Sequence, residues 1–291
     1  MLSILIPTYN YNVFPLVENL YNQCVICKIP FEIIVFDDAS QHHFDNQKIN
    51  DLAKARFEVL DKNIGRSAIR DLLAKTAKYD WLLFLDADVL PENEFFIQKY
   101  LNEMQTNSYQ IIVGGYRYED QKPNEDQILR WKYGKDREYA LAEIRNTKPY
   151  HYIFSGNILL QKSIFVEANY SGEENLYGMD IYFSYKIFEN KYRILHIDNF
   201  IFHLGLENNQ QFFNKSLKAV ESRMYLYNKY PDVLAVSPLL QHYLKLKKYG
   251  TASLFKFWFK TFEPLLKKQL LSANPNLFLF DIYRLGYLCS L

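Results

Sequence analysis

The chain has 291 residues with a net charge of +1, a hydrophobic fraction of 49% and only ten glycines. The near-neutral charge excludes a dedicated nucleic-acid-binding protein, and no apolar run is long enough to predict a membrane span. None of the glycines forms a G-x-G-x-x-G or G-x-x-x-x-G-K-[ST] motif, which excludes a Rossmann dinucleotide fingerprint, a Walker-type phosphate loop and a kinase glycine-rich loop.

The N-terminal part of the chain alternates short apolar runs, which predict buried strands, with segments of helical spacing. Strands are expected over residues 2–6, 31–36, 57–60, 81–85 and 111–113, and helices over residues 13–27, 66–78 and 91–105. Near-continuous apolar strands that alternate with helices are typical of an α/β fold. We therefore expect a mostly parallel central sheet covered by helices on both faces.

After Tyr118 the alternation becomes less regular. Further strands are expected over residues 153–160 and 193–203, flanking a helix over 179–189, and then helices over 210–230, 239–248 and 253–271. This change of pattern predicts a domain over residues 1–205 and a C-terminal helical extension over residues 206–291.

Polar side chains follow three of the predicted parallel strands. The first strand is followed by Pro7, Thr8, Tyr9 and Asn10, the second by Asp37 and Asp38, and the fourth by Asp86, Ala87 and Asp88. The carboxyl ends of parallel strands share one sheet edge, where ligands bind in open α/β folds. Carboxylates gathered there need a compensating cation, and their oxygens suit Mg²⁺ or Mn²⁺. The alternative is that these aspartates only form turns and helix caps.

Four blocks of sequence occur in the order and spacing of the family 2 glycosyltransferases. They are Ser3-Ile-Leu-Ile-Pro-Thr-Tyr-Asn10, Glu32-Ile-Ile-Val-Phe-Asp-Asp-Ala-Ser40, Asn63-Ile-Gly-Arg-Ser-Ala-Ile-Arg70 and Trp81-Leu-Leu-Phe-Leu-Asp-Ala-Asp88. The chain resembles this family over about residues 1–205. The resemblance implies a Rossmann-like GT-A fold, a nucleotide-diphospho-sugar donor and inversion at the anomeric carbon. Residues 1–115 would then bind the donor, and residues 116–205 would supply the acceptor and catalytic half.

The resemblance also implies a role for each matching residue on the donor side. Asp37 or Asp38 matches the acidic residue that holds the nucleoside base, beside the backbone of residues 8–10. Asn63 and Arg70 belong to the N-x-G-x-x-x-A-R block, whose arginine contacts the base or the diphosphate. Asp71 stands where the family usually has Asn.

A metal site is implied in the same way. Asp86, Ala87 and Asp88 match the D-x-D motif, and Asp88 is the stronger metal-ligand candidate of the two aspartates. His203 resembles the histidine that some GT-A enzymes supply as a further metal ligand, and a purely structural histidine is the alternative. Because the sequence has no glycine-rich loop to bind phosphates, a metal held by these residues is the candidate partner for the diphosphate.

On the acceptor side, the resemblance points to Gly156 and Asn157 in the segment Phe154-Ser-Gly-Asn-Ile158. The segment Tyr177-Gly-Met-Asp-Ile-Tyr182 aligns with the family's G-E-D, in which Met179 replaces Glu and Asp180 would be the general base. A helix-start residue stabilised by the helix dipole is the alternative for Asp180. Glu173 and Glu174 are the fallback bases.

These residues predict a metal-dependent inverting hexosyl- or N-acetylhexosaminyl-transferase. Its donor would be a UDP-sugar, and its acceptor a hydroxyl of a glycan or lipid-linked molecule in cell-surface polysaccharide synthesis. One alternative is a non-catalytic glycan- or nucleotide-sugar-binding relative, because the G-E-D block is only partly matched. A sugar-nucleotide pyrophosphorylase fits less well, because its glycine-rich loop after the first strand is missing.

The C-terminal helices combine lysines with aromatic residues, and two interpretations stay open. The helices contact an anionic membrane surface, or they pack on the core with a solvated lysine face. Three cysteines and an N-terminus without a signal-peptide pattern favour a cytoplasmic protein, either free or peripheral on the inner face of the cell membrane. Cys24 and Cys27 are expected to be core residues rather than a redox or metal pair.

Overall fold

The computed structural model describes residues 1–42, 44–106, 108–172 and 176–291. Contacts divide the chain into two compact units. The first comprises residues 1–117, 139–175 and 189–205, and the second comprises residues 118–138, 176–188 and 206–291. The units therefore do not follow the single boundary expected after residue 205, because two earlier segments cluster with the C-terminal helices.

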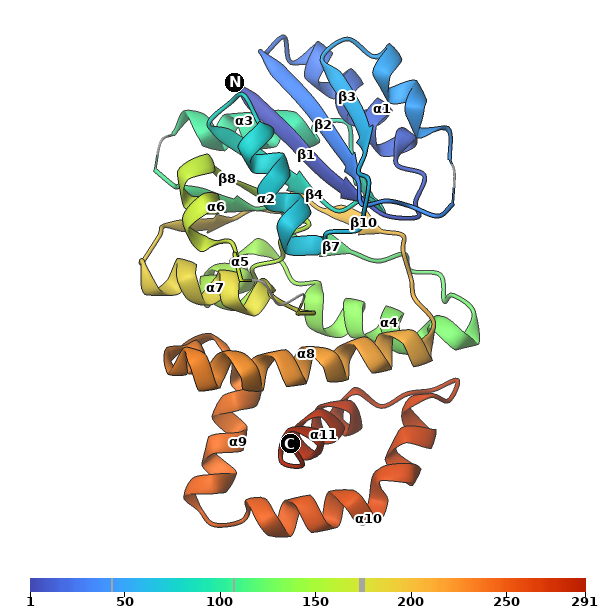
Figure 1. Cartoon of the computed structure of the whole chain (residues 1–291), viewed down its shortest axis with the longest axis vertical. Coiled ribbons are helices and arrows are strands. Elements are labelled where there is room, and N and C mark those ends of the chain that lie inside the picture. Colours follow the sequence, from blue (N-terminus) through green and yellow to red (C-terminus); the bar gives the residue numbers. More distant parts are fainter. Residues whose placement is uncertain (43, 107, 173–175) are drawn as a thin grey trace. The chain divides into compact units, whose positions relative to one another are not determined.

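The main sheet of the first unit has seven strands in the order β3-β2-β1-β4-β8-β6-β9 (Figure 1). They are β1 (Leu2–Thr8), β2 (Phe31–Asp37), β3 (Ala55–Val59), β4 (Trp81–Leu85), β6 (Ile111–Val113), β8 (Asn157–Gln161) and β9 (Ile194–His196). Strands β1 to β4 run parallel, as do β6 and β9, whereas β8 is antiparallel to both of its neighbours. The expected mostly parallel α/β sheet is confirmed.

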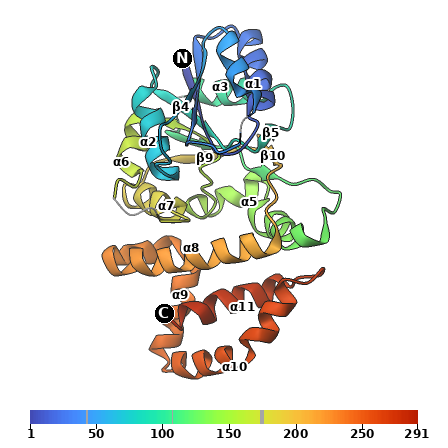
Figure 2. The ribbon, with the colours of Figure 1, turned by 45° about the vertical axis from the view of Figure 1, so that its right-hand side comes forward.

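Helices cover both faces of this sheet. Helices α1 (Phe14–Ile26) and α3 (Phe96–Gln105) pack together on one face, and α2 (Arg66–Thr76) and α6 (Lys162–Ala168) pack together on the other (Figure 2). Burial on both sides explains why the central strands read as unbroken apolar runs. Cys24 is buried in α1 as a free thiol, and burial raises its pKa to about 12, so it is a core residue as expected.

Three short strands form a second sheet in the order β5-β10-β7. They are β5 (Val89–Pro91), β10 (Ile201–His203) and β7 (Tyr116–Arg117). The helix expected over residues 91–105 is present as α3, but its expected start at Pro91 is wrong, because Pro91 ends a strand and α3 begins five residues later. Proline is tolerated there because β5 is an edge strand, where a missing N–H breaks no ladder.

The strand expected over residues 193–203 is interrupted, so that β9 and β10 belong to different sheets. The interruption falls at Asn199, whose side-chain amide donates to the Phe96 carbonyl at 2.9 Å. Its backbone N–H donates to the carbonyl of Ile197, also at 2.9 Å. This turn redirects the chain and carries residues 201–203 to β5.

The second unit is helical. It contains α4 (Ile128–Tyr133), α7 (Asp180–Glu189, apart from its last residue), α8 (Asn209–Lys229), α9 (Pro238–Lys248), α10 (Ala252–Leu270) and α11 (Leu277–Leu288). Its core joins helices far apart in sequence and includes Leu129, Phe213, Phe259 and Phe280. The Leu129 N–H donates to Asn209 Oδ1 at 2.8 Å, which ties α4 to the start of α8.

Short irregular helices complete the two units. The first unit has 3₁₀ turns over Asp45–Asp51 and Pro149–His151 and the short helix α5 (Ala142–Asn146). The second has 3₁₀ turns over Glu125–Gln127 and Pro231–Val236 and a π-helical turn over Gly134–Glu138.

Candidate active site

The carboxyl ends of β1 and β2 are locked together at the predicted edge. Thr8 pairs with Asp37 in the parallel register, and the Asp38 N–H donates to the Thr8 carbonyl at 2.9 Å. Asn10 joins the two following loops. Its N–H donates to Ser40 Oγ at 2.6 Å, and its Oδ1 accepts the N–H groups of Gln41 and His42. The segment predicted to lie beside the nucleoside base is therefore held in one shape.

The two adjacent aspartates after β2 have different local roles. Both carboxylate oxygens of Asp38 accept backbone N–H groups, from Ile64 at 2.7 Å and Gly65 at 3.0 Å. The Asn63 amide donates to the Asp38 carbonyl at 3.0 Å, so Asn63 belongs to the same lock. Asp37 Oδ1 accepts the Ser40 N–H at 2.7 Å. Asp38 thus holds the loop that begins α2, which leaves Asp37 as the better candidate to contact a base.

Asp86, which follows β4, lies among side-chain donors from helix α2 and strand β7. Arg70 Nη2 donates to its Oδ1 at 2.7 Å, and Arg66 Nη2 donates to both oxygens at 3.1 and 3.2 Å. The Tyr116 hydroxyl donates to Oδ2 at 3.2 Å. A Cβ at Gly156 would lie 2.1 Å from this same oxygen, so only glycine allows the strand β8 to approach so closely.

The electrostatics of Asp86 follow from these neighbours. Burial alone would raise its pKa, but the positive charges of Arg66, Arg70 and His203 outweigh burial and hold the pKa below its ordinary value. Asp86 is therefore ionised at neutral pH and already bound by two arginines. Arg70 itself is only 4% exposed, whereas Arg66 is 54% exposed.

Asp88 has a different environment, built by the second sheet. His203 pairs with Val89 across the antiparallel strands, which brings His203 Nε2 within 3.5 Å of Asp88 Oδ2. Burial raises the pKa of Asp88, as does the charge of Asp86, although His203 opposes the shift. A Cβ at Gly205 would lie 1.8 Å from Asp88 Oδ2, so the chain after β10 packs directly on this carboxylate.

The predicted acceptor-side residues are placed as follows. The Asn157 side chain is fully buried, with its amide donating to the carbonyls of Gly115 at 2.8 Å and Asn199 at 2.9 Å. Its Oδ1 accepts the Tyr100 hydroxyl at 2.6 Å. Asn157 therefore fastens β8 to its neighbours, while Gly156 contacts Asp86. In the second unit, Met179 is buried and Asp180 begins α7.

Asp180 belongs to a charged group within the second unit. Burial and, to a smaller extent, the neighbouring charge of Arg284 lower the pKa of Arg223 on α8 to about 10, although Asp180 opposes the shift. Gly178, just before α7, has φ +78°, and a Cβ there would lie 2.9 Å from Ala219 Cβ. The fallback bases Glu173 and Glu174 lie outside the described residues.

Sequence reasoning named Arg70 but assigned no role to Arg66, which also binds Asp86. The signal was present, because residues four apart share one face of a helix, so Arg66 and Arg70 reach the same carboxylate. Arg66 Nη2 also approaches Ser155 Oγ at 3.4 Å. The hydroxyl contact of Tyr116 was not predicted, because it depends on the second sheet, which the sequence did not predict.

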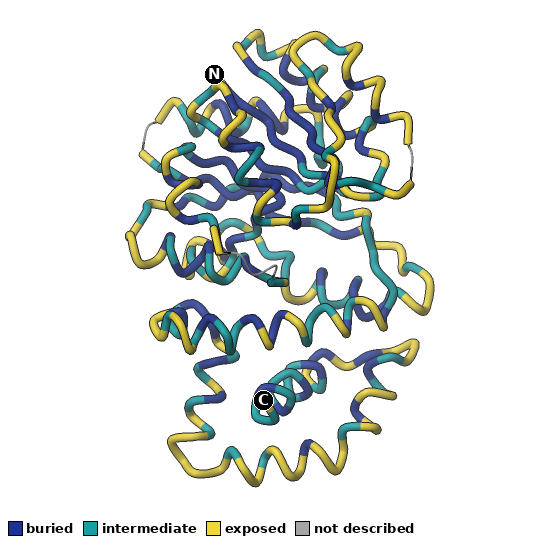
Figure 3. The backbone as a smooth tube through the Cα atoms, viewed as in Figure 1, coloured by how far each residue is buried: buried dark blue, intermediate teal, exposed yellow. Residues whose placement is uncertain are grey.

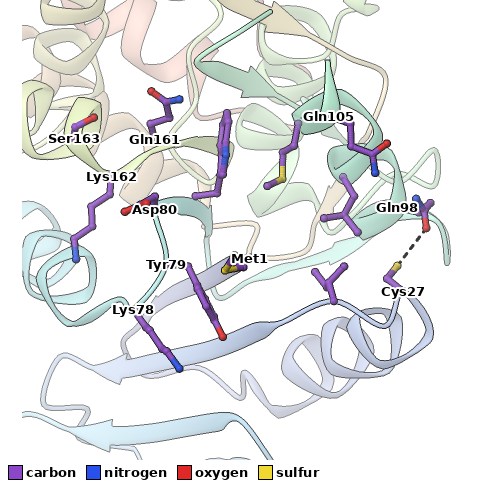
Figure 4. A pocket seen from close by; sticks show the side chains of 14 residues that line it. Met1, Cys27, Lys78, Tyr79, Asp80, Gln98, Gln105, Gln161, Lys162 and Ser163 are labelled. Atoms are coloured by element: carbon purple, nitrogen blue, oxygen red, sulfur yellow. Dashed lines mark hydrogen bonds between the residues drawn. The ribbon is translucent and has the colours of Figure 1, made fainter. Parts of the chain in front are cut away.

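A cavity of about 850 Å³ lies at the opposite, amino-terminal edge of the sheet (Figure 4). Tyr79, Trp81 and Gln161 are among the residues that line it. Among the described residues, none of the predicted site residues lines this cavity. One of its cations, Lys162, is already bonded to the Ala77 carbonyl at 2.8 Å. The candidate site is therefore the carboxylate edge and not this cavity.

In the described part of the chain, no helix is both long and apolar enough to span a bilayer.

Comparisons with known proteins agree with this fold. Residues 3–167 match the model of Glycosyl transferase family 2. Relatives include a chondroitin synthase of Pasteurella multocida (24% identity over 64% of this chain and 23% of the relative). A hyaluronan synthase of the same organism matches 64% of this chain at 24% identity, and 22% of the relative is covered. A chondroitin synthase of Escherichia coli also matches 64% of this chain, at 25% identity, and 32% of the relative is covered. The chain thus spans a third or less of the length of these relatives.

Among solved structures, S. aureus TarS 1–349 superposes with a TM-score of 0.53 at 15% identity, covering 97% of this chain and 89% of that one. A longer S. aureus TarS structure gives a TM-score of 0.51 at 18% identity, covering 75% of this chain and 39% of that one. These likenesses concern the fold alone. Because the family match covers more than half of the residues, the chain belongs to glycosyl transferase family 2.

Proposed function

We propose that the protein transfers a hexosyl or N-acetylhexosaminyl group from a nucleotide-diphospho sugar, a UDP-sugar, to a hydroxyl of a glycan or lipid-linked acceptor. Membership of the family supports the reaction type. The names of the relatives, chondroitin and hyaluronan synthases, support a role in polysaccharide synthesis. The observation that carries the proposal is the D-x-D at the carboxyl edge of the sheet, where Asp86 is bound by Arg66 and Arg70.

Donor binding is assigned to this edge. Asp37 and the backbone of residues 8–10 would hold the nucleoside base, since Asp38 and Asn63 are engaged in the loop before α2. The exposed guanidinium of Arg66 and the buried one of Arg70 would offset the charge of the diphosphate, with Asp86 orienting both. Charge-assisted bonds of guanidinium groups to phosphate are strong and directional.

A divalent metal fits Asp88 and His203 better than it fits Asp86. Asp88 and His203 present a carboxylate and an imidazole 3.5 Å apart, whereas Asp86 is taken by arginines. Across the described residues, no three acidic, histidine or cysteine side chains gather to hold a metal by themselves. Donor oxygens would complete the shell, and the nitrogen ligand favours Mn²⁺ over Mg²⁺. When bound, the metal would neutralise negative charge on the leaving group.

We assign the general base to Asp180. Its carboxylate would take the proton of the acceptor hydroxyl as the hydroxyl oxygen attacks the anomeric carbon. The new C–O bond forms while the bond from the anomeric carbon to the diphosphate oxygen breaks, releasing the nucleoside diphosphate. A single displacement inverts the anomeric configuration.

Two substitutions test these assignments separately. Asp88→Ala should abolish the Mn²⁺-dependent part of UDP binding in calorimetry, and wild-type affinity would remove Asp88 from the metal site. Asp180→Asn should abolish transfer with nearly unchanged UDP affinity, and undiminished turnover would remove Asp180 from the mechanism. If the wild-type protein binds a donor but turns none over in any tested condition, the result would favour a non-catalytic binding relative over an enzyme.

The proposed acceptor also suggests where in the cell the protein acts. A lipid-linked acceptor would be met at the inner face of the cell membrane, and we propose that helices of the second unit contact that surface.

A further inference from the structure

Helix α10 carries apolar side chains that the protein does not cover. Leu254 is 70% exposed, Phe257 72% and Leu265 65%. Beside them Phe255, Trp258 and Phe262 form a continuous row, with ring centroids 5.7 and 5.4 Å apart. We call these six residues the α10 face, and Figure 3 shows α10 as largely exposed. An apolar surface of this kind usually marks a binding site.

Folding of the second unit does not use this face. Phe259, Leu266 and Leu270 are the buried residues of α10, and all three belong to the core of the unit. Leu254, Phe257 and Leu265 lie on the other side of the same helix, as their spacing of three and eight residues requires. One apolar side of α10 therefore packs in the core of the second unit, and a second apolar side remains available to a partner.

Positive charge accompanies the α10 face. Between residues 239 and 270 the chain has seven lysines and one acidic residue, Glu263. Lys256, Lys260 and Lys267 repeat along one exposed side of α10, and three more lysines are exposed in the last turn of α9. Glu263 pairs with Lys260 at 3.1 Å, and its single negative charge leaves the other six lysines uncompensated by an acidic residue of this segment. The partner must be apolar and anionic together.

We infer that the α10 face binds the surface of an anionic phospholipid membrane, lying in the interface with its aromatic rings inserted and its lysines at the headgroups. Aromatic rings and lysine side chains with long apolar stems suit this boundary. A second copy of the chain fits less well, because pairing would bring two lysine-rich helices together. The inference concerns binding alone and holds whether or not the proposed sugar transfer is correct.

Vesicle flotation of the full chain tests the charge requirement. Vesicles that contain phosphatidylglycerol should bind the protein, vesicles of phosphatidylcholine alone should bind it weakly, and added salt should release it. The triple variant Lys256→Gln, Lys260→Gln, Lys267→Gln should bind about a hundredfold more weakly, from the usual contribution of each lysine near such a surface. Equal binding to both vesicle types would overturn the inference.

The apolar requirement needs its own variant and control. Phe257→Ser with Leu265→Ser should weaken binding at least about tenfold, and circular dichroism should show an unchanged helix content. The matched control is Phe95→Ser, which removes a 58% exposed ring from the first unit and should bind like the wild type. Wild-type binding by the double variant would contradict the inference. So would a dimer in solution that the double variant abolishes while lipid binding persists.

Discussion

The carboxyl edge of the sheet and the α10 face depart from ordinary protein surfaces in opposite ways. At the edge, charged groups are buried: Arg70 is 4% exposed, and its partner Asp86 15%. On α10, large apolar groups are exposed, with Phe257 at 72%. Each departure would cost stability without a compensating partner. At the edge the partners lie within the fold, so substitutions there should destabilise the protein, whereas on α10 the inferred partner is external.

The largest expected effect is at Asp86. Asp86→Ala breaks the ion pair between Asp86 and the buried guanidinium of Arg70, and breaking a buried ion pair costs about 3–5 kcal/mol. Urea unfolding should show this loss. Asp88→Ala is the matched control. Because the Asp88 side chain is 30% exposed, this substitution should lower the free energy of unfolding by less than Asp86→Ala does. Equal stability of Asp86→Ala and wild type would mean that the arginines do not depend on Asp86.

A second effect should follow pH. His196 is 1% exposed, with Nδ1 facing Arg145 at 3.1 Å and Nε2 facing the Pro149 carbonyl at 2.9 Å. Burial lowers its pKa from 6.5 to about 4. As pH falls, His196 is therefore protonated in the unfolded chain at a higher pH than in the folded chain. The free energy of unfolding falls by up to about 3 kcal/mol between pH 6.5 and 4.

Urea unfolding at pH 7 and pH 5 measures this dependence. His196→Gln should be less stable at pH 7 but should lose less on acidification than the wild type. An identical loss in both proteins would show that His196 does not control the acid sensitivity of the first unit.

Two glycines provide a smaller, paired test. A Cβ at Gly156 would lie 2.1 Å from Asp86 Oδ2 and Tyr116 Oη, so Gly156→Ala should cost about 1–3 kcal/mol and weaken UDP binding. Gly250 has φ +69° and open space around it, so Gly250→Ala should cost about 1 kcal/mol through backbone strain alone. Thermal unfolding and calorimetry separate the two. Unchanged UDP affinity in Gly156→Ala would place the donor elsewhere.

The smallest effect is expected on α10. Phe257→Ser removes a side chain that contributes to no core, so the free energy of unfolding should change by less than about 0.5 kcal/mol. Urea unfolding in the absence of lipid measures this change. A loss of several times that size would show that Phe257 is covered in solution, which would remove the contrast between the two regions.

Local pattern predicted the sheet and most helices, because apolar runs and helical spacing report burial directly. It missed β5, β7 and the break at Asn199, since these depend on pairing between segments far apart in the sequence, such as Ile201 with Pro91 and with Tyr116. Helix α11 was also missed, although Asn276 caps it by accepting the N–H groups of Phe278 and Leu279, a signal that the sequence carries.

The sequence placed the aspartates at the correct edge but could not divide their roles. Asp38 and Asp86 look alike in sequence, yet one accepts backbone N–H groups and the other binds arginines. Asn157 appeared to be an acceptor contact, whereas its amide is fully used inside the first unit. Such distinctions depend on which groups the tertiary fold brings within hydrogen-bonding distance, which spacing along the chain does not encode.

The most direct test of the proposed function is nucleoside-diphosphate release from a panel of nucleotide sugars, measured with Mn²⁺ and candidate glycan acceptors. We expect release from at least one UDP-sugar by the wild-type chain, and loss of that release in Asp88→Ala under the same conditions. Release that persists undiminished in Asp88→Ala, or a wild-type chain that neither binds nor cleaves any donor, would contradict it.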